Sequence, residues 1–336
     1  MADLTTKYLG LQLKNPIIVG ASDLSEEISN LREMEEVGAA AVVYKSLFEE
    51  QIQLERAQLD EELTEFDDRH PEMISTHPNI QHAGAEEHLL ELRKAKATLG
   101  IPVIASLNAV YSNTWIDYAK KIEDTGVDAL ELNFFHIPFA IDEEGVAIEE
   151  EQVSILKDIR KQISIPVSVK ISPFYSNILN MVQNMDEEGV DGFVLFNRLF
   201  EPEINIYKEE HLFPFNLSEK GDHKISLRYS GLLYDNINAA ICANTGIFSG
   251  EDVLKMILAG ADCVQIVSTL YKNSISHIPK MLEEIEKWMD NSSYASIKEF
   301  QGKLSRKNVS NPFVYKRAQY VDILMNPEEI IKKYKY

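Results

Sequence analysis

The segment Gly189-Val-Asp-Gly-Phe-Val-Leu195 decides the fold, because the chain repeats its pattern three more times. In each copy a helical pattern ends in glycine, passes a short turn and enters an apolar run. Glycine accepts the left-handed conformation that ends a helix, so each copy predicts a helix end, a tight turn and a buried strand. The other copies are Gly38-Ala-Ala-Ala-Val-Val-Tyr44, Gly126-Val-Asp-Ala-Leu-Glu-Leu132 and Gly260-Ala-Asp-Cys-Val-Gln-Ile266.

A second pattern, Ile-Pro-Val, begins two further strands at Ile101 and Ile165. Proline is tolerated there because a missing N–H costs little at a strand entrance. The patterns together predict eight strands, and several are apolar almost throughout, as in parallel strands buried on both faces. The predicted strands span residues 17–19, 41–45, 103–107, 129–133, 167–171, 192–196, 240–244 and 263–267. Amphipathic segments between them span residues 26–37, 86–99, 115–124, 149–162, 178–187 and 251–259.

Alternating strands and helices imply right-handed βαβ units and a parallel α/β sheet. Eight units favour a single closed (β/α)8 TIM barrel. An open sheet would carry G-x-G-x-x-G after the first strand, but that position reads Val19-Gly-Ala-Ser-Asp-Leu-Ser25. Extended loops, residues 48–85 after the second strand and 199–227 after the sixth, lie where barrel enzymes build their sites. We predict a barrel over residues 1–304 and a C-terminal extension over 305–336, packed on the barrel or at an oligomer contact.

Composition narrows the functional classes. The chain has 336 residues, of which 45% are hydrophobic and 26% charged, an ordinary globular balance. Its formal net charge of −21 disfavours nucleic acid and anionic membranes as partners. No apolar stretch approaches the roughly 20 residues that cross a bilayer, and no signal peptide is evident, so we expect a cytoplasmic protein. Cys242 and Cys263 lie in apolar runs, which favours buried free thiols over a disulfide, a metal site or a cluster.

Polar side chains stand at the carboxyl ends of the predicted strands, where barrel enzymes place their chemistry. Lys45 and Lys170 adjoin apolar strands. A lysine there can be a surface residue, but at the mouth of a closed barrel its charge needs an anionic or dipolar partner. Asn133 and Asn197 end two further strands, where asparagine often only caps a turn. The two lysines together indicate a site that handles developing negative charge.

A phosphate site is predicted from the segments that follow strands seven and eight, a common place for one in barrels. Strand seven leads into Thr245-Gly246 and then a helix after Ser249, and strand eight leads into Ser268-Thr269. Gly246 lets backbone N–H groups approach an anion, and the hydroxyl groups add donors. Ser249 also fits an ordinary helix N-cap, which is compatible with such a site.

With these residues the chain resembles the dihydroorotate dehydrogenase family, FMN-dependent (β/α)8 barrels, in its soluble class-1-like form, over about residues 4–304. The resemblance rests on residues 15–22, 44–46, 131–133, 169–173, 230–231, 245–252 and 259–266, in order and at barrel spacing. It implies FMN as cofactor, with Lys170 at the N1/C2 carbonyl edge of the flavin, where negative charge accumulates on reduction. The implied FMN-binding residues are Gly20, Ala21, Ser22, Lys45, Ser106 and Lys170 around the flavin, and Ser230, Gly231, Thr245, Gly246, Ser268 and Thr269 around the phosphate.

The resemblance also implies a substrate half, which departs from the family pattern. Asn133 and Asn197 would hydrogen-bond a planar amide-bearing substrate, and Lys45 would contact the flavin or an acidic substrate group. After Asn133 the chain reads Phe134-Phe135-His136-Ile137-Pro138-Phe139, so His136 stands where the family has a cysteine or serine base. A histidine with a pKa near 6.5 suits proton abstraction, although it could instead only shape the pocket. Arg198 replaces a threonine or serine, and either binds a carboxylate or is a solvated loop residue.

The leading hypothesis is oxidation of dihydroorotate to orotate, in pyrimidine biosynthesis. His136 would take the C5 proton while a hydride passes from C6 to flavin N5. The first alternative is a related FMN barrel acting on a different cyclic amide or enoate, prompted by Phe135, Phe139 and Arg198. Further alternatives are a barrel that binds flavin or phosphate without turnover and a Schiff-base lyase that uses Lys170 without flavin.

Partners follow partly from the resemblance. It suggests a homodimer. Quinone-dependent relatives carry a membrane-associating N-terminal extension, and this chain begins almost at strand one, so we expect a soluble electron acceptor or a flavin or iron–sulfur partner subunit. Two cysteines are too few for an internal four-cysteine cluster.

Overall fold

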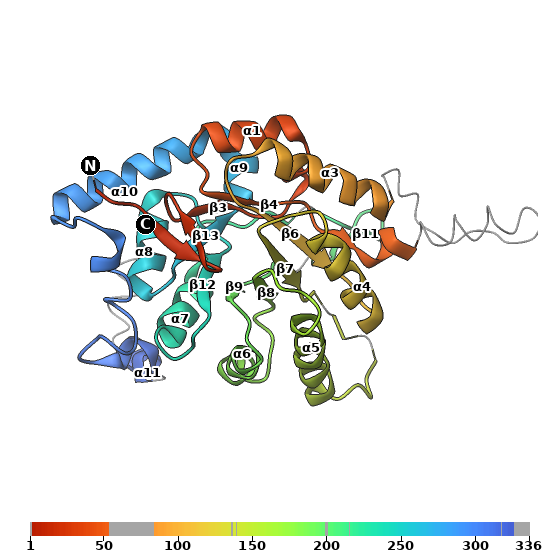
Figure 1. Cartoon of the computed structure of the whole chain (residues 1–336). Coiled ribbons are helices and arrows are strands. Elements are labelled where there is room, and N and C mark those ends of the chain that lie inside the picture. The colour runs from red at the N-terminus through yellow and green to blue at the C-terminus, as the bar shows by residue number, and fades with distance from the viewer. Residues whose placement is uncertain are drawn as a thin grey trace, which may run out of the picture.

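The computed structural model describes residues 2–53, 84–135, 137–138, 140–198, 201–214, 216–316 and 318–325. Eight parallel strands form a closed barrel (Figure 1). Their order is β4-β3-β13-β12-β9-β8-β7-β6, and β4 pairs with β6 to close the ring. The strands are β3 (Ile17–Val19), β4 (Ala41–Val43), β6 (Val103–Asn108), β7 (Ala129–Asn133), β8 (Val167–Ile171), β9 (Gly192–Leu195), β12 (Ala240–Asn244) and β13 (Cys263–Ile266). The predicted (β/α)8 barrel is confirmed.

Helices surround this barrel (Figure 1). The predicted helix over residues 178–187 is confirmed as α6 (Ile178–Glu187), whereas the sequence pattern places the start of α7 (Lys224–Leu233) in a loop. The helices are α1 (Ile28–Glu36), α3 (Ala85–Thr98), α4 (Ser112–Glu123), α5 (Gly145–Arg160), α6 (Ile178–Glu187), α7 (Lys224–Leu233), α8 (Gly250–Ala259), α9 (Ser268–Asn273), α10 (Ile278–Ser292) and α11 (Ala318–Met325).

The glycine and the aspartate of the repeated pattern each have a structural role. Gly126 and Gly189 adopt φ values of +82° and +84°, the left-handed region that ends each preceding helix. In three copies the aspartate two residues after the glycine accepts the backbone N–H of the first or second residue in the neighbouring strand. The pairs are Asp128 with Val103, Asp191 with Val167 and Asp262 with Ile241, at 2.7, 2.8 and 2.7 Å. The pattern therefore ends a helix and also fixes where the adjacent strand begins.

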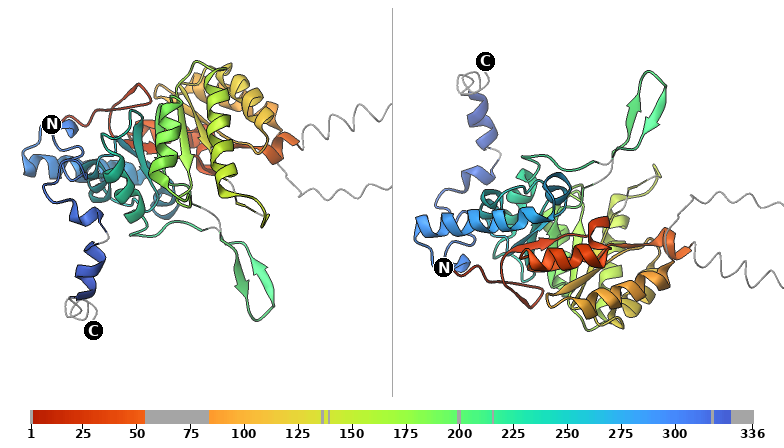
Figure 2. Two further views of the ribbon diagram at one scale, coloured as in Figure 1. Left: turned by 90° about the horizontal axis from the view of Figure 1, so that it is seen from below. Right: turned by 90° about the horizontal axis from the view of Figure 1, so that it is seen from above.

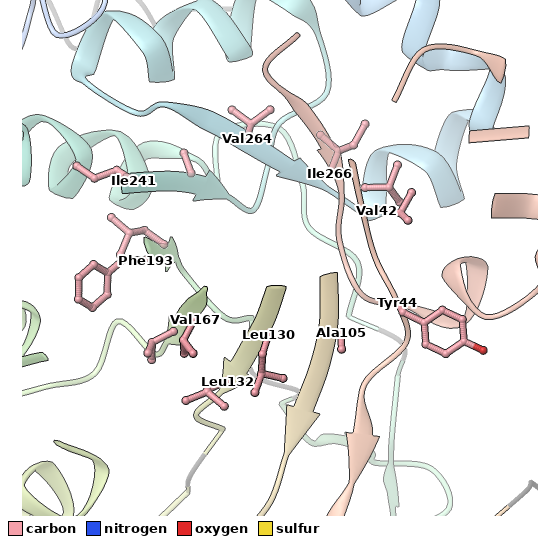
Figure 3. Close-up of a cluster of buried hydrophobic side chains, with 14 of the residues drawn as sticks. Val42, Tyr44, Ala105, Leu130, Leu132, Val167, Phe193, Ile241, Val264 and Ile266 are labelled. Carbon is pink, nitrogen blue, oxygen red and sulfur yellow. The ribbon is translucent and has the colours of Figure 1, made fainter. Parts of the chain in front are cut away.

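Apolar side chains from the strands fill the barrel wall and its contacts with the helices (Figure 3). Below them an N-terminal hairpin, β1 (Thr6–Tyr8) and β2 (Leu11–Leu13), packs at the amino end of the barrel. Tyr8 and Leu9 are each only 1% exposed. Gly192 leaves room for them, since a Cβ there would lie 2.6 Å from Leu9 Cδ2. The sequence analysis predicted the first barrel strand but not this hairpin, which precedes it.

Cys242 and Cys263 face the same buried layer. They are register partners on β12 and β13, and both are free and fully buried. The prediction of buried free thiols is confirmed.

The two long loops differ in what they contain. The loop after β9 carries a hairpin, β10 (Glu203–Asn205) and β11 (Glu210–Leu212), that projects from the barrel (Figure 2). The loop after β4 begins with β5 (Leu47–Phe48), which pairs with the end of β6. Its residues 54–83 lie outside the part of the chain that the structure describes.

The chain continues after α10 along α7 and α8. The backbone N–H groups of Gly302, Leu304 and Arg306 donate to carbonyls of Ile257, Leu258 and Gly231. Farther on, α11 points away from the barrel (Figure 2). The domain boundary between residues 304 and 305 stays a prediction. Among the described residues, no helix is long and apolar enough to span a membrane.

Candidate active site

A cavity of about 380 Å³ opens at the carboxyl ends of the barrel strands. Its wall receives residues from the ends of most barrel strands or the loops that follow them, as expected for a barrel site. Many of the residues predicted from the sequence meet here. Those that line the cavity are Ala21, Ser22, Lys45, Asn133, Lys170, Asn197, Arg198, Thr245, Gly246, Ser268 and Thr269.

Two predicted flavin residues lie just behind the wall. The Ser106 hydroxyl is 2.6 Å from the Ser46 hydroxyl, and Ser46 does line the cavity. Gly20 lies against Gln265 and Val267, and a Cβ there would come within 2.8 Å of Val267 Cγ2. Gly20 therefore permits a close approach of strands rather than forming the cavity surface. His136 and Phe139 lie outside the described residues.

Ser230 and Gly231 do not line the cavity, which corrects their predicted place in a phosphate site. Both lie inside α7, and Ser230 is fully buried. Gly231 packs against the Tyr315 ring, and its carbonyl accepts the Arg306 N–H. The sequence pattern Ser-Gly at this point reflects close packing of the C-terminal segment on α7.

Lys170 lines the cavity and is nearly buried. It projects from β8, and its side chain is 9% exposed, with Nζ 3.8 Å from Glu131 Oε1 on β7. Glu131 also accepts a 2.6 Å hydrogen bond from Gln265 Nε2 on β13. Gln265 Oε1 is buried without a hydrogen-bond partner. A buried ammonium on β8 and an unsatisfied amide acceptor on β13 thus both line the cavity, and Glu131 contacts both side chains.

Lys45 stands on the wall after β4 between two carboxylates. Its Nζ lies 3.0 Å from Asp23 Oδ1 and 2.8 Å from Glu26 Oε2. Partial burial alone would lower the pKa of Lys45, but hydrogen bonds with Glu26 and Asp23 outweigh it and raise that pKa. Lys45 is therefore charged, and its charge is already compensated. The sequence could not show this pairing, because Asp23 and Glu26 follow a different strand.

Asn133 and Asn197 contact each other directly. Asn197 Nδ2 donates to Asn133 Oδ1 at 2.5 Å, and Asn108 Nδ2 donates to the Asn133 carbonyl at 2.7 Å. This arrangement leaves Asn133 Nδ2 and Asn197 Oδ1 for a ligand, one donor and one acceptor. Such a pair matches the N–H and C=O of an amide edge.

Arg198 is held in place by its own loop. Its Nε donates to the Asn216 carbonyl at 2.8 Å, and its Nη1 lies 2.7 Å from Asp222 Oδ2. Two of its donors and its charge are therefore engaged within the protein.

Hydroxyl and backbone groups gather after the carboxyl ends of β12 and β13, where a phosphate was predicted. The Gly246 N–H donates to Ser218 Oγ at 3.1 Å, and the Ser218 N–H donates to Ser268 Oγ at 2.9 Å. Gly246 has φ +71°, and a Cβ there would lie 2.5 Å from the His223 backbone nitrogen. Thr269 Oγ1 donates to the Ile247 carbonyl. Sequence reasoning missed Ser218, which lies in the loop after β9 and carries no local motif.

Fold and site together define a (β/α)8-barrel enzyme whose carboxyl-end cavity offers one buried cation, an amide pair and a hydroxyl cluster. The sequence model of the dihydroorotate dehydrogenase family matches residues 3–289, and the chain belongs to this family. Its members are oxidoreductases that act on a CH–CH bond, so the predicted enzyme class and resemblance are confirmed.

Individual relatives match the chain along most of its length. The catalytic subunit of dihydroorotate dehydrogenase B (NAD(+)) from Thermoplasma volcanium is 28% identical, over 90% of this chain and 98% of its own. The proteins of the same name from Methanocaldococcus jannaschii and Pyrococcus abyssi are each 27% identical. They cover 84% and 89% of this chain, and 92% and 98% of their own.

Proposed function

We propose that the protein is an FMN-dependent dehydrogenase that oxidises a ring CH–CH bond of a cyclic amide, the reaction that converts dihydroorotate to orotate. The observation that carries this proposal is the placement of Lys170 and the Asn133–Asn197 pair in one cavity. A cation beside an amide-recognition pair suits a cofactor that gains negative charge and a substrate that presents N–H and C=O groups.

The donor set of the cavity fits FMN. Gln265 Oε1 is a buried acceptor without a partner, and a flavin ring offers an N–H donor for such a group. Lys170 would face the electron-rich edge of that ring, and Ser218, Gly246 and Ser268 would hold the phosphate group. Bound FMN would supply the acceptor for a hydride, and a cavity of about 380 Å³ is within the usual size of cofactor sites.

The protein's own residues orient the substrate and manage its proton. Asn133 and Asn197 would fix an amide edge above the cavity floor, while Phe135 on the wall would exclude water from one side. His136 is the proposed base, since it follows this segment directly in the sequence. The second candidate function is the same chemistry on a cyclic amide other than dihydroorotate. The ion pairs of Lys45 and Arg198 favour it.

Electrons must leave the reduced cofactor through a second reaction. The relatives above are named catalytic subunits, which supports a partner subunit that accepts them. We further propose that the chain forms a homodimer, which sedimentation of the purified protein would test.

The first experiment is an anaerobic absorbance titration of the FMN-loaded protein with dihydroorotate. Oxidation of dihydroorotate would bleach the flavin band, because a substrate of this enzyme delivers two electrons to it. A flavin spectrum that persists would contradict dihydroorotate as substrate but leave the cofactor in place. Failure to bind FMN would contradict the proposed function and favour the lysine lyase.

The base assignment needs a matched pair of variants. His136→Ala should slow flavin reduction by roughly 10²-fold or more, since the substrate proton would lose its acceptor. His211→Ala, on the exposed strand β11, is the control and should keep the normal rate. An unchanged rate in His136→Ala would show that another group takes the proton.

A further inference from the structure

Three cations of the cavity wall all have carboxylate partners in the structure. Lys45 contacts the carboxylates of Asp23 and Glu26. Arg198 contacts the carboxylate of Asp222, and Lys170 lies close to that of Glu131. The distances are 3.0 Å for Lys45–Asp23, 2.8 Å for Lys45–Glu26, 2.7 Å for Arg198–Asp222 and 3.8 Å for Lys170–Glu131. These groups together therefore carry one more negative charge than positive, before any cofactor phosphate adds to it.

A substrate carboxylate would need one of these cations for itself, because burying an unpaired carboxylate is costly. Drawing Lys45 toward such a group would leave Asp23 and Glu26 unpaired within a few ångströms of a third anion. Lys170 is held low in the barrel beside Glu131, which is 1% exposed. Arg198 already gives its Nε to the Asn216 carbonyl and its Nη1 to Asp222.

The same wall offers hydrogen-bonding groups to an uncharged ligand. Asn133 Nδ2 and Asn197 Oδ1 remain for a ligand after the 2.5 Å hydrogen bond between the two side chains. An amide edge satisfies both without moving any charge. The cavity is therefore built to recognise N–H and C=O groups and carries no cation free of a carboxylate among Lys45, Lys170 and Arg198.

We propose that the substrate is an uncharged cyclic amide, an inference that rests on the function proposed above. Asp23 and Glu26 are the specificity-determining residues: they occupy Lys45 and repel a ring that carries a carboxylate. The ligand class is a cyclic diamide of pyrimidine size without an acidic substituent. The same ring with a carboxylate is the compound that the site discriminates against.

The test compares two planar rings that differ only in the carboxylate, uracil and orotate. Each is titrated into the FMN-loaded protein, and binding is followed by calorimetry and by the perturbation of the flavin spectrum. The side chains of Asp23 and Glu26 are 67% and 40% exposed, so low ionic strength is used to limit screening. We expect uracil to bind at least about tenfold more tightly than orotate.

Charge removal on the wall should abolish this preference. In the double variant Asp23→Asn and Glu26→Gln, Lys45 becomes available, and orotate affinity should rise by roughly tenfold or more while uracil affinity stays within about twofold. The control is Glu251→Gln with Glu283→Gln, two exposed carboxylates that change the net charge equally. This control should leave both affinities unchanged.

The outcomes separate the inference from the proposed function. Equal or tighter binding of orotate by the unmodified protein overturns the inference and leaves the cyclic-amide dehydrogenase standing. An unchanged orotate affinity in the double variant overturns the role of Asp23 and Glu26. Binding of neither ring to the FMN-loaded protein overturns the proposed function itself. The comparison in the unmodified protein does not depend on the folding of any variant.

Discussion

At the scale of single residues, Lys170 and Glu131 form the most consequential pair. Both are nearly inaccessible, and their charged atoms lie 3.8 Å apart. Lys170→Met should destabilise the cofactor-free protein by about 3–5 kcal/mol, because Glu131 would remain as a buried unpaired charge. It should also weaken FMN binding by roughly tenfold or more, through loss of the cation at the cavity floor. Urea denaturation and a flavin fluorescence titration measure the two effects.

The double variant Lys170→Met with Glu131→Gln separates stability from cofactor binding. Removing both charges should restore most of the lost free energy of unfolding, because uncharged side chains then replace the buried ion pair. FMN affinity should stay low. Wild-type FMN affinity in either variant would show that Lys170 does not face the cofactor.

Sequence reasoning found cavity-lining residues where their position along a strand alone brings them to the cavity. Lys170, Asn133 and Thr245 stand at strand ends, and a barrel brings all strand ends to one mouth. Ser218 and Asp23 were not found, because their roles depend on approach between segments distant in the chain. The misplaced Ser230–Gly231 pair shows the same limit, since nothing local distinguishes a glycine that contacts a ring from one that contacts a phosphate.

At the scale of elements, the packing of the C-terminal segment on α7 makes a testable claim. Gly231 lies inside α7, where alanine would normally favour the helix by about 1 kcal/mol. A Cβ there would lie 2.6 Å from Tyr315 Cζ, and the Tyr315 hydroxyl donates to the Leu304 carbonyl at 2.6 Å. We therefore expect Gly231→Ala to destabilise the full chain by about 1 kcal/mol in urea denaturation, since overpacking outweighs helix propensity.

Two comparisons isolate that contact. Gly145 is the first residue of α5, and a Cβ there would have no atom within 4 Å. The variant Gly145→Ala should therefore be neutral or slightly stabilising. Adding Tyr315→Ala should remove the penalty of Gly231→Ala, so the double variant should lose less stability than the two single losses combined. If Gly231→Ala raises stability as Gly145→Ala does, the segment is not packed on α7.

Elements were predictable where one pattern sets both strand and helix. The glycine–aspartate repeat marks a helix end and the start of a neighbouring strand, so most barrel strands were placed within one or two residues. The β1–β2 hairpin was missed because its turn lacks the usual signal. Leu9 and Gly10 both have positive φ, 51° and 75°, and leucine is rare there. Burial of Leu9 under the barrel outweighs that local preference, which a sequence pattern does not reveal.

At the scale of the whole molecule, the formal charge of −21 makes acid stability a balance among many carboxylates, but one histidine has a separable effect. His88 on α3 is buried with its ring edge-on to Tyr44. Burial, with a smaller contribution from the Lys45 charge, lowers its pKa to about 4. The unfolded chain titrates this group near 6.5 and so binds its proton first as the pH falls. Stability is therefore full above pH 6.5 and is lost toward pH 4.

Between pH 7 and pH 4 the free energy of unfolding should fall by about 3 kcal/mol because of His88, given the difference between its two pKa values. The measurement is the free energy of unfolding in urea at several pH values, for the wild type and for His88→Gln, which cannot titrate. The variant should be less stable at pH 7 through lost packing, yet its stability should fall less steeply below pH 6.5. His211→Gln, at an exposed position on β11, should keep the wild-type slope. Parallel pH profiles for wild type and His88→Gln would mean that the fold does not hold this imidazole neutral.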